Sequence, residues 1–460
     1  MSSAWLKQAL QAEGATTADT LDGDWRADIC IVGGGYTGLW TAIELKSRDP
    51  SLDVALVEKD ICGAGASGAN AGYLLSLWVQ FQMLSGLYGV EEAQRLCHES
   101  EHTIDEIGAF CREHDIDAHW RKTGSIWGAT CEAQSGHWNP ILEGLRDRQL
   151  HQFELLGREQ IADQTGTNAF LAGVLDNSIA LVHPGHLVRG LRRVAKSMGV
   201  RVYEHTPMTR LGRSTPPTVM TPTGTITADK VILGLYGWSL GLRELSRGAM
   251  VIFTDAVMTE PVPEELNALG WRDGPGITDS RVFVQAYRPT VDGRVMWTKA
   301  GGSLPYGGRM DPLMNRPSQT ETQMREVLRR LYPSLADVPI SGRWTGPIDR
   351  SKNGLPRFGA LPGCRDILFG YGYSGSGLVL SRMGSRMLAS LALEDDDEWS
   401  RAGLVAAPGR DFPSEPFRYV GGHAVRAAIA RKDKLDHQGR KPGPITKYLL
   451  RYKPASYKPT

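Results

Sequence analysis

The chain of 460 residues is longer than one hydrophobic core normally supports, so we expect two or three domains. Hydrophobic residues at 41%, charged residues at 22% and a net charge of +1 are typical of a soluble globular protein and argue against binding of nucleic acid or anionic membranes through overall charge. The six cysteines lack Cys-x-x-Cys spacing and none lies at metal-ligand spacing from a histidine, no apolar run reaches membrane-spanning length, and the N-terminus has no secretory signal. We therefore expect a cytoplasmic protein without a metal site or a membrane span.

The hydrophobic pattern predicts alternating strands and helices along most of the chain. A buried strand at 28–32 is followed by a helix from residue 36 and a second strand at 54–57. Apolar side chains at helical spacing predict an amphipathic helix at 90–114. The later elements are a helix at 187–198; strands at 201–203, 218–220, 223–226 and 230–233; β-strands within 250–302; a polar helix at 314–332; a loop-rich segment at 344–377 with a strand at 367–369; and a helix at 381–393.

The end of the chain is strongly basic. Residues 431–460 carry nine Lys or Arg and two Asp. Charge runs of this kind usually lie on solvated surfaces, so we expect a solvated or surface-packed tail in preference to an anion-binding one.

A glycine motif follows the first predicted strand. Gly33, Gly35 and Gly38 have the G-x-G-x-x-G spacing of dinucleotide-binding folds, in which glycines allow a tight turn, close approach to a pyrophosphate and close helix–strand packing. The following helix directs its N-terminal N–H groups at the phosphates. Glu58 ends the next strand, 20 residues after Gly38, where a carboxylate can accept hydrogen bonds from ribose hydroxyls. The alternative is a glycine-rich turn that binds no nucleotide.

Two further loops are rich in small residues. The first spans 62–72 and can pack flat against a large planar ligand. The second, at 370–378, precedes a predicted helix whose N-terminus can bind an anion or a carbonyl oxygen. Each loop alone could be an ordinary turn.

Together these segments resemble the FAD-dependent D-amino-acid oxidase and glycine oxidase superfamily. Within it the chain is most similar to the gamma-glutamylputrescine oxidase-like and proposed aminophosphonate oxidoreductase groups. The matching runs, over roughly residues 25–395, are IVGGGYTGLWTAIEL, GASGANAG, HPGHLVRGL, WTGPID, NGLPRFG and GYGYSGSG. The chain has Ala69 where many members have Arg and Ser376 where many have His, so the contacts near the flavin are expected to differ.

The resemblance implies an α/β fold with a discontinuous Rossmann-like FAD-binding domain and a second α+β substrate domain on an antiparallel or mixed sheet. The expected boundaries are an N-terminal extension at 1–27; the FAD-binding domain at 28–87, 165–245 and 343–400; the substrate domain at 88–164 and 246–342; and a basic C-terminal extension at 401–460. Relatives that bind flavin covalently have a Cys just before the last flavin loop. Cys364 lies after that place, so we expect non-covalent FAD.

The resemblance also implies which residues contact FAD. They are Gly33, Gly35, Tyr36, Thr37, Gly38, Glu58, Lys59, Gly65, Ala66, Ser67, Asn70, Ala71, Gly72, Tyr73, Met208, Gly234, Trp238, Gly372, Tyr373, Ser374, Gly375, Ser376, Gly377 and Leu378.

Four residues are candidates for the substrate side. Tyr287 and Arg288 lie in a predicted strand, where a planar guanidinium would suit a carboxylate or phosphonate; a surface Arg at a strand end is the alternative. Trp344 could wall the pocket or pack in the core. Lys299 could stand near flavin N5 and stabilise charge during oxygen attack. His183, followed by Pro184, is interpreted as part of a turn.

We therefore expect an FAD-dependent enzyme that oxidises the C–N bond of a small amine, amino acid or aminophosphonate, with molecular oxygen or another electron acceptor. Two alternatives stay open at this point. One is an NAD(P)-dependent oxidoreductase that uses only the first glycine motif. The other is a non-catalytic flavin-binding or RNA-associated accessory protein that uses the basic tail.

Overall fold

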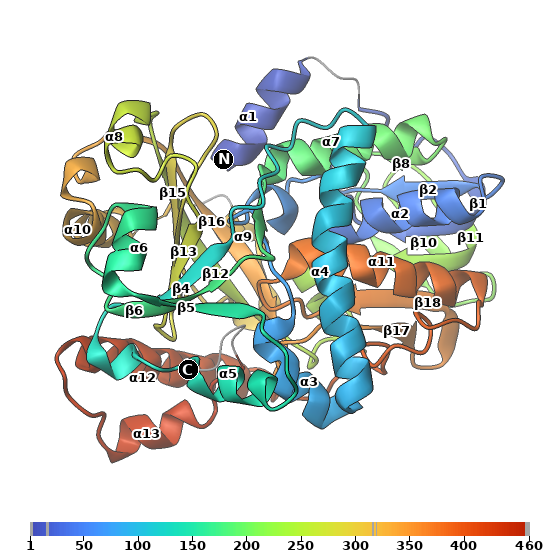
Figure 1. The fold of residues 1–460 in the computed structure, drawn as a ribbon. Helices are drawn as coiled ribbons and strands as arrows, with labels where there is room; N and C mark the ends of the chain where they lie inside the picture. The colour runs from blue at the N-terminus through green and yellow to red at the C-terminus, as the bar shows by residue number, and fades with distance from the viewer. Residues whose placement is uncertain (1–2, 15–17, 315–316, 319, 456–460) are drawn as a thin grey trace.

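The computed structural model describes residues 3–14, 18–314, 317–318 and 320–455. Two eight-stranded sheets lie beside each other, each with its own helices (Figure 1). Parts of the predicted extensions 1–27 and 401–460, and part of the predicted helix 314–332, lie outside the described residues.

The first sheet carries the glycine motif. Its central strands run parallel, in the order β18-β11-β1-β2-β8, and their apolar residues are buried on both faces, as is usual for parallel sheets covered by helices. The strands are β1 (Trp25–Val32), β2 (Val54–Val57), β8 (Arg201–Tyr203), β9 (Arg210–Gly212), β10 (Thr218–Met220), β11 (Thr225–Leu233), β17 (Arg357–Leu361) and β18 (Cys364–Tyr371). The segments 223–226 and 230–233, predicted as separate strands, belong to the single strand β11.

Helices bury one face of this sheet. They are α2 (Tyr36–Arg48), α4 (Val90–Glu113), α7 (Pro184–Ser197) and α11 (Gly377–Leu393), and their apolar stripes share one core with the sheet. Figure 1 shows α4 crossing α11 in front of the first sheet. The helix predicted at 90–114 is therefore confirmed. It packs on α11, in the layer of helices that belongs to the first sheet, although its residues fall within the predicted substrate domain.

The second sheet is mixed and mostly antiparallel, in the order β16-β12-β15-β14-β13-β4-β6-β5. Its strands are β4 (Ser125–Ala129), β5 (Phe153–Gly157), β6 (Ala172–Asp176), β12 (Met250–Thr259), β13 (Gly276–Asp279), β14 (Gln285–Pro289), β15 (Val295–Lys299) and β16 (Ile340–Arg350). One face packs against α6 (Arg158–Thr165), α8 (Pro263–Ala268) and α10 (Glu321–Leu331). The opposite face looks toward the first sheet. The α/β fold, with a Rossmann-like part joined to an α+β part, is as predicted.

The segment predicted as loop-rich is largely strand. β16 pairs with β12 along its whole length, and β17 pairs with β18. The sequence did not predict β16 because Gly346 and Pro347 are residue types that are rare in strand interiors. Pro347 is tolerated because β16 is the edge strand of its sheet. β6 and β16 both belong to the second sheet, although the predicted boundaries assign most of their residues to the FAD-binding domain. The polar helix predicted at 314–332 begins at Glu321 as α10.

The remaining elements connect the two sheets or extend the ends of the chain. They are α1 (Ala4–Glu13), α3 (Phe81–Tyr88), α5 (Asn139–Arg146), α9 (Asp311–Met314), the pair β3 (Tyr73–Leu74) and β7 (Ala180–Leu181), and the 3₁₀ helices η1 (Ala66–Gly68), η2 (Trp78–Gln80), η3 (Glu132–Gln134), η4 (Tyr236–Gly241), η5 (Tyr306–Gly308) and η6 (Pro333–Leu335). In the described part of the basic tail, α12 (Phe417–His437) and α13 (Pro444–Leu450) lie beneath the second sheet in Figure 1. Among the described helices, none is long and apolar enough to cross a membrane.

Candidate active site

A cavity of about 630 Å³ opens between the two sheets. On one side it is lined by residues at the carboxyl ends of β1, β2, β11 and β18, where open α/β sheets bind their ligands. On the other side it is lined by one face of the second sheet. All but three of the predicted cofactor residues line this cavity; Gly38, Gly372 and Ser376 do not.

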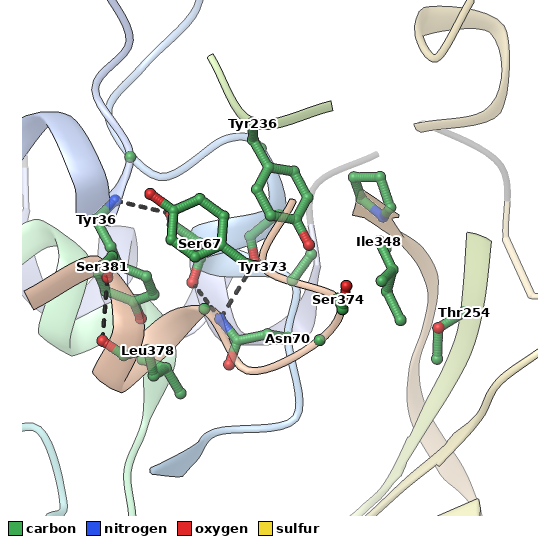
Figure 2. Close-up of a pocket in the computed structure, with 18 of the residues that line it drawn as sticks. Tyr36, Ser67, Asn70, Tyr236, Thr254, Ile348, Tyr373, Ser374, Leu378 and Ser381 are labelled. Carbon is green, nitrogen blue, oxygen red and sulfur yellow. Dashed lines mark hydrogen bonds between the residues drawn. The ribbon is translucent and has the colours of Figure 1, made fainter. Parts of the chain in front are cut away.

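The glycine loop after β1 leaves no room for side chains. Gly33 has φ +113°, and a Cβ there would lie 2.6 Å from the carbonyl oxygen of Gly234. A Cβ on Gly35 would lie 2.9 Å from Ser67 Oγ, which accepts a hydrogen bond from the Tyr36 N–H at 2.9 Å (Figure 2). A Cβ on Gly38 would collide with the Gly33 carbonyl, so Gly38 acts by letting α2 pack close to β1.

The end of the cavity nearest β2 suits an adenosine. Glu58 Oε2 accepts a hydrogen bond from the Gly34 N–H at 2.7 Å, and Oε1 accepts one from the Asp60 N–H at 3.0 Å. Burial raises the pKa of Glu58, and a carboxylate has further lone pairs for ribose hydroxyls. The Lys59 ammonium lies 4.3 Å from the centre of the Trp238 ring, so both side chains mark this end of the cavity.

The loop before α11 is held by a residue of the second sheet. Asp349 on β16 accepts hydrogen bonds from the N–H groups of Gly372 (2.5 Å) and Tyr373 (3.0 Å), and burial raises its pKa to about 7. The Tyr373 hydroxyl lies 2.7 Å from Thr37 Oγ1 on α2, and its ring stacks on Tyr236. Asp349 and Tyr236 were not predicted as site residues, although Asp349 ends the WTGPID run.

The small-residue loop after β2 is braced internally. The Asn70 amide donates to the carbonyl oxygens of Ala66 (3.2 Å) and Ser67 (2.8 Å), and its oxygen accepts the Gly72 N–H at 2.8 Å. Figure 2 shows Asn70 beside Ser67, with Thr254 and Ile348 of the second sheet across the cavity. The backbone from residue 65 to 72 therefore forms a fixed wall.

The cavity-facing side of the second sheet is built mostly from small side chains. On the four adjacent strands β12, β15, β14 and β13 these are Thr254, Ala256, Thr298, Ala286 and Thr278. Thr254 Oγ1 is buried without a hydrogen-bond partner among the described residues. A face of this kind leaves room for a large flat ring and offers it a hydroxyl.

Tyr287 and Lys299 lie on the predicted strands but do not line the cavity. Successive strand residues point to opposite faces, and Ala286 and Thr298 are the neighbours that face inward. The Tyr287 hydroxyl donates to Gln285 Oε1 at 2.7 Å within the core on the far side. The Lys299 ammonium donates to Gln323 at 2.5 Å, and burial lowers its pKa. The structure does not bring Lys299 to the cavity wall.

Arg288 and Trp344 support the small-residue loop from behind. Arg288 Nη1 donates to the carbonyl oxygens of Ala71 (3.2 Å), Gly72 (2.9 Å) and Val182 (2.8 Å), and burial lowers its pKa to about 10. Trp344 Nε1 donates to the carbonyl oxygen of Ala69 at 2.9 Å. Neither side chain lines the cavity, so the guanidinium expected to bind an acidic substrate is bound to main-chain carbonyls.

His183 has the structural role expected of it. It is the N-cap of α7, where its Nδ1 accepts the His186 N–H at 3.1 Å, and it does not line the cavity. Among the described residues, no group of His, Cys, Asp and Glu is arranged to hold a metal ion.

The sequence did not reveal two charged residues of the second sheet that line the cavity. Arg350 ends β16; its Nη1 donates to the carbonyl oxygen of Ala455 at 3.0 Å, its buried Nε has no partner among the described residues, and burial lowers its pKa. Asp176 ends β6 and is 4% exposed. A single charged residue at a strand end gives no distinctive pattern in the sequence.

The C-terminal helix α12 holds another part of the cavity wall. The Asp433 carboxylate accepts hydrogen bonds from the N–H groups of Val282 (3.0 Å) and Phe283 (3.1 Å). Arg281 donates to His437 Nε2 at 2.6 Å. Val282 and Val284 line the cavity, so the basic tail, in its described part, supports the site.

These features fit FAD. Gly33 and Gly35 leave no room for a Cβ beside the cavity. Glu58 lies at one end of the cavity, and the small side chains of the second sheet, with the unpartnered Thr254 hydroxyl, lie at the other. The sequence profile of the DAO family, described as FAD dependent oxidoreductase, matches residues 28–391. The protein belongs to this family. Its cofactor is therefore FAD, and the NAD(P) alternative is set aside.

Individual relatives agree with the family. The chain is 29% identical to gamma-glutamylputrescine oxidoreductase of Escherichia coli (strain K12), over 91% of this chain and 95% of the relative. It is 27% identical to a glycine oxidase of Pseudomonas aeruginosa, over 79% of this chain and 94% of the relative. The crystal structure of glycine oxidase from Geobacillus kaustophilus, at 22% identity, superposes with a TM-score of 0.69 over 84% of this chain and all of that one, which supports the fold.

Proposed function

We propose that the protein oxidises the carbon–nitrogen single bond of a small amine or amino acid to an imine. The observation that supports this proposal is the single cavity that joins an FAD cradle to a sheet face of small side chains. The names of the relatives point to the same kind of substrate. Bound FAD supplies the acceptor for the hydride that leaves the carbon next to nitrogen.

The residues of the chain then have three tasks: to bind the substrate, to orient it and to exclude water. The hydroxyls of Thr254, Thr278 and Thr298 can orient an amine beside the cofactor. The apolar side chains of Val282 and Val284 line the same cavity. An apolar lining favours the neutral form of an amine, which is the form that can give up a hydride.

We propose molecular oxygen as the electron acceptor. The overall reaction would be amine plus O₂ giving imine plus hydrogen peroxide, and water would hydrolyse the imine to a carbonyl compound. Lys299 gives this choice no support, because its side chain does not line the cavity. Another acceptor, as in a dehydrogenase, is the alternative.

The function and the acceptor can be tested in one assay. The holoprotein is incubated in air with small amines and amino acids, and carbonyl product and peroxide are measured together. Equal amounts of both support an oxidase. Carbonyl product that forms only when an artificial dye replaces oxygen would show a dehydrogenase, and no product with either acceptor would contradict C–N oxidation.

We also propose that FAD is held without a covalent bond. Among the described residues that line the cavity, none is Cys or His, and Cys364 begins β18 without lining the cavity. Acid precipitation should therefore leave yellow FAD in the supernatant, whereas colour in the pellet would contradict the proposal. All six cysteines are free thiols, and they fit the reducing cytoplasm that we propose as the location.

An anionic substrate such as an aminophosphonate keeps little structural support. The expectation of an acidic substrate depended on Arg288, but the Arg288 guanidinium binds the carbonyls of Ala71, Gly72 and Val182. The second sheet instead places a carboxyl group, that of Asp176, in the wall of the cavity.

A further inference from the structure

Asp176 places a buried carboxyl group on the substrate side of the cavity. It is the last residue of β6 and lines the cavity with 4% of its surface exposed. Among the lining residues described on the strands of the second sheet, the charged ones are Asp176 and Arg350. β6 and β16 are six places apart in the strand order, so Arg350 is not a neighbour of Asp176.

The partners of this carboxylate are all neutral. Oδ1 accepts hydrogen bonds from the Ser178 N–H (2.9 Å) and the Ser178 hydroxyl (2.5 Å), and Oδ2 accepts one from the Ser76 hydroxyl (3.1 Å). No Lys, Arg or His in the described part of the chain forms an ion pair with it. A buried carboxylate without a cation is costly unless a ligand supplies the opposite charge or the group takes up a proton.

The surroundings of Asp176 suit an organic cation. The aromatic rings of Trp127 on β4 and Phe153 on β5 line the same end of the cavity, together with Val174 and Ile179. Aromatic faces attract cations, and they do so more strongly where water is excluded. Apolar walls also match the methylene chain of an alkylamine.

We propose that Asp176 binds a second, protonated nitrogen of the substrate, so that the substrate class is a diamine or another amine with a cationic tail. This inference rests on the proposed function, because it takes the oxidised C–N bond to lie beside the cofactor. The nitrogen of that bond has to be neutral so that the carbon next to it can lose a hydride. A carboxylate stabilises a protonated nitrogen, so the nitrogen at Asp176 is the one that does not react.

The test uses primary amines that differ only in the charge of the tail. The probes are 1,4-diaminobutane, 1-aminobutane and 4-aminobutanoate, with longer diamines to find the best chain length. The rate of flavin reduction is measured without oxygen at several concentrations of each. We expect the second-order rate constant of the best diamine to exceed that of the neutral amine of equal length by roughly 10- to 100-fold, and the anionic amine to be the slowest.

Two variants assign the preference to one residue. Asp176→Asn keeps the size of the side chain and removes the charge, so half-saturation should need a higher diamine concentration and the preference for the diamine over the neutral amine should disappear. Glu101→Gln is the matched control. The negative charge of Glu101 on α4 raises the pKa of Asp176. Glu101 accepts a hydrogen bond from Trp78 and does not line the cavity. This variant should keep the preference.

The outcomes separate this inference from the proposed function. If no amine reduces the flavin, C–N oxidation is wrong and the inference falls with it. If amines reduce the flavin at rates independent of tail charge, or the anionic amine is fastest, only the inference is overturned. If Asp176→Asn does not fold, the comparison of tails in the wild-type holoprotein decides alone. Asp176→Asn protein that still prefers the diamine would also overturn it.

Discussion

Glu58 and Gly34 form a 2.7 Å hydrogen bond from the backbone N–H of the glycine loop to the carboxylate of the residue that follows β2. The same carboxylate was predicted to bind the ribose of FAD. Glu58 therefore has a second role, because it also fixes the loop along which the pyrophosphate would lie. Its replacement should affect the cofactor through both contacts.

Glu58→Ala should weaken FAD affinity by roughly ten- to a hundredfold, because a charge-assisted hydrogen bond contributes on the order of 1.5–3 kcal/mol. Glu58→Gln keeps an oxygen for the Gly34 N–H and should lose less. Fluorescence titration of apoprotein with FAD measures both variants. The absorbance spectrum at saturating FAD should match the wild type. Full affinity in Glu58→Ala would show that no ribose is bound there.

Gly35→Val should abolish FAD binding and leave folded protein. A Cβ at this position would lie 2.9 Å from Ser67 Oγ, within the lining of the cavity. The control is Gly86→Val on α3, where a Cβ would meet no atom within 4 Å. The ratio of flavin to protein after purification is the measurement. A full flavin load in Gly35→Val would contradict this path for the pyrophosphate.

Arg288→Lys should lower the stability of the holoprotein and its flavin content without changing substrate preference. Arg288 Nη1 donates hydrogen bonds to the carbonyls of Ala71, Gly72 and Val182. Each carbonyl left without a partner lowers the free energy of unfolding by about 1–3 kcal/mol. A lysine ammonium cannot reproduce the planar geometry of the guanidinium. Thermal melting and flavin content report this loss.

Substrate kinetics distinguish this supporting role from substrate binding. With a supporting role, Arg288→Lys changes KM by the same factor for 4-aminobutanoate and 1-aminobutane. A rise in KM confined to the anionic amine would restore Arg288 as the anchor of an acidic group.

Asp433 should make folding less favourable as the pH rises from about 4 to about 6. Burial raises its folded pKa to about 6, above the ordinary 3.8. Between these values the folded protein keeps a proton that the unfolded chain has released, so the stability contributed by this group is present below pH 3.8 and is lost as the pH passes 6. The loss is at most about 3 kcal/mol.

Asp433→Asn removes this titration, so the difference in unfolding free energy between wild type and variant should change across that pH range. The pKa of the nearby His437 is lowered to about 4, and only the difference isolates Asp433. Asp436→Asn, on the same helix and paired with Lys432 at 2.5 Å, is the control. If the unfolding free energies of wild type and Asp433→Asn changed in parallel with pH, the raised pKa of Asp433 would be contradicted.

The cofactor half of the site could be predicted because its signals are local in the sequence. Gly33 and Gly35 meet backbone and side-chain atoms that leave no space for a Cβ, and such positions admit few other residues. The small-residue loop at 62–72 could be predicted for the same reason. These sequence patterns can be recognised without knowing how distant parts of the chain pack.

The substrate half could not be predicted because it depends on which face of each strand meets the cavity. The strands that contain Ala286 and Thr298 were predicted. The neighbouring Tyr287 and Lys299 were predicted as site residues because of their functional groups. A shift of one residue reverses the two faces of a strand, and only the packed sheet decides between them. A small residue such as Ala286 has no functional group that would mark it as a site residue. Arg288 was predicted to bind substrate because of its guanidinium, but its hydrogen-bond partners are main-chain carbonyls.

We propose that this FAD-dependent protein takes a hydride from the carbon next to an amine nitrogen. The most direct measurement is the long-wavelength flavin absorbance of the holoprotein, without oxygen, during titration with small amines, amino acids and aminophosphonates, and with alcohols of matched size. We expect at least one amine to bleach this band and its alcohol counterpart to leave the band unchanged. A band that persists with every amine, or that the alcohols bleach equally well, would contradict it.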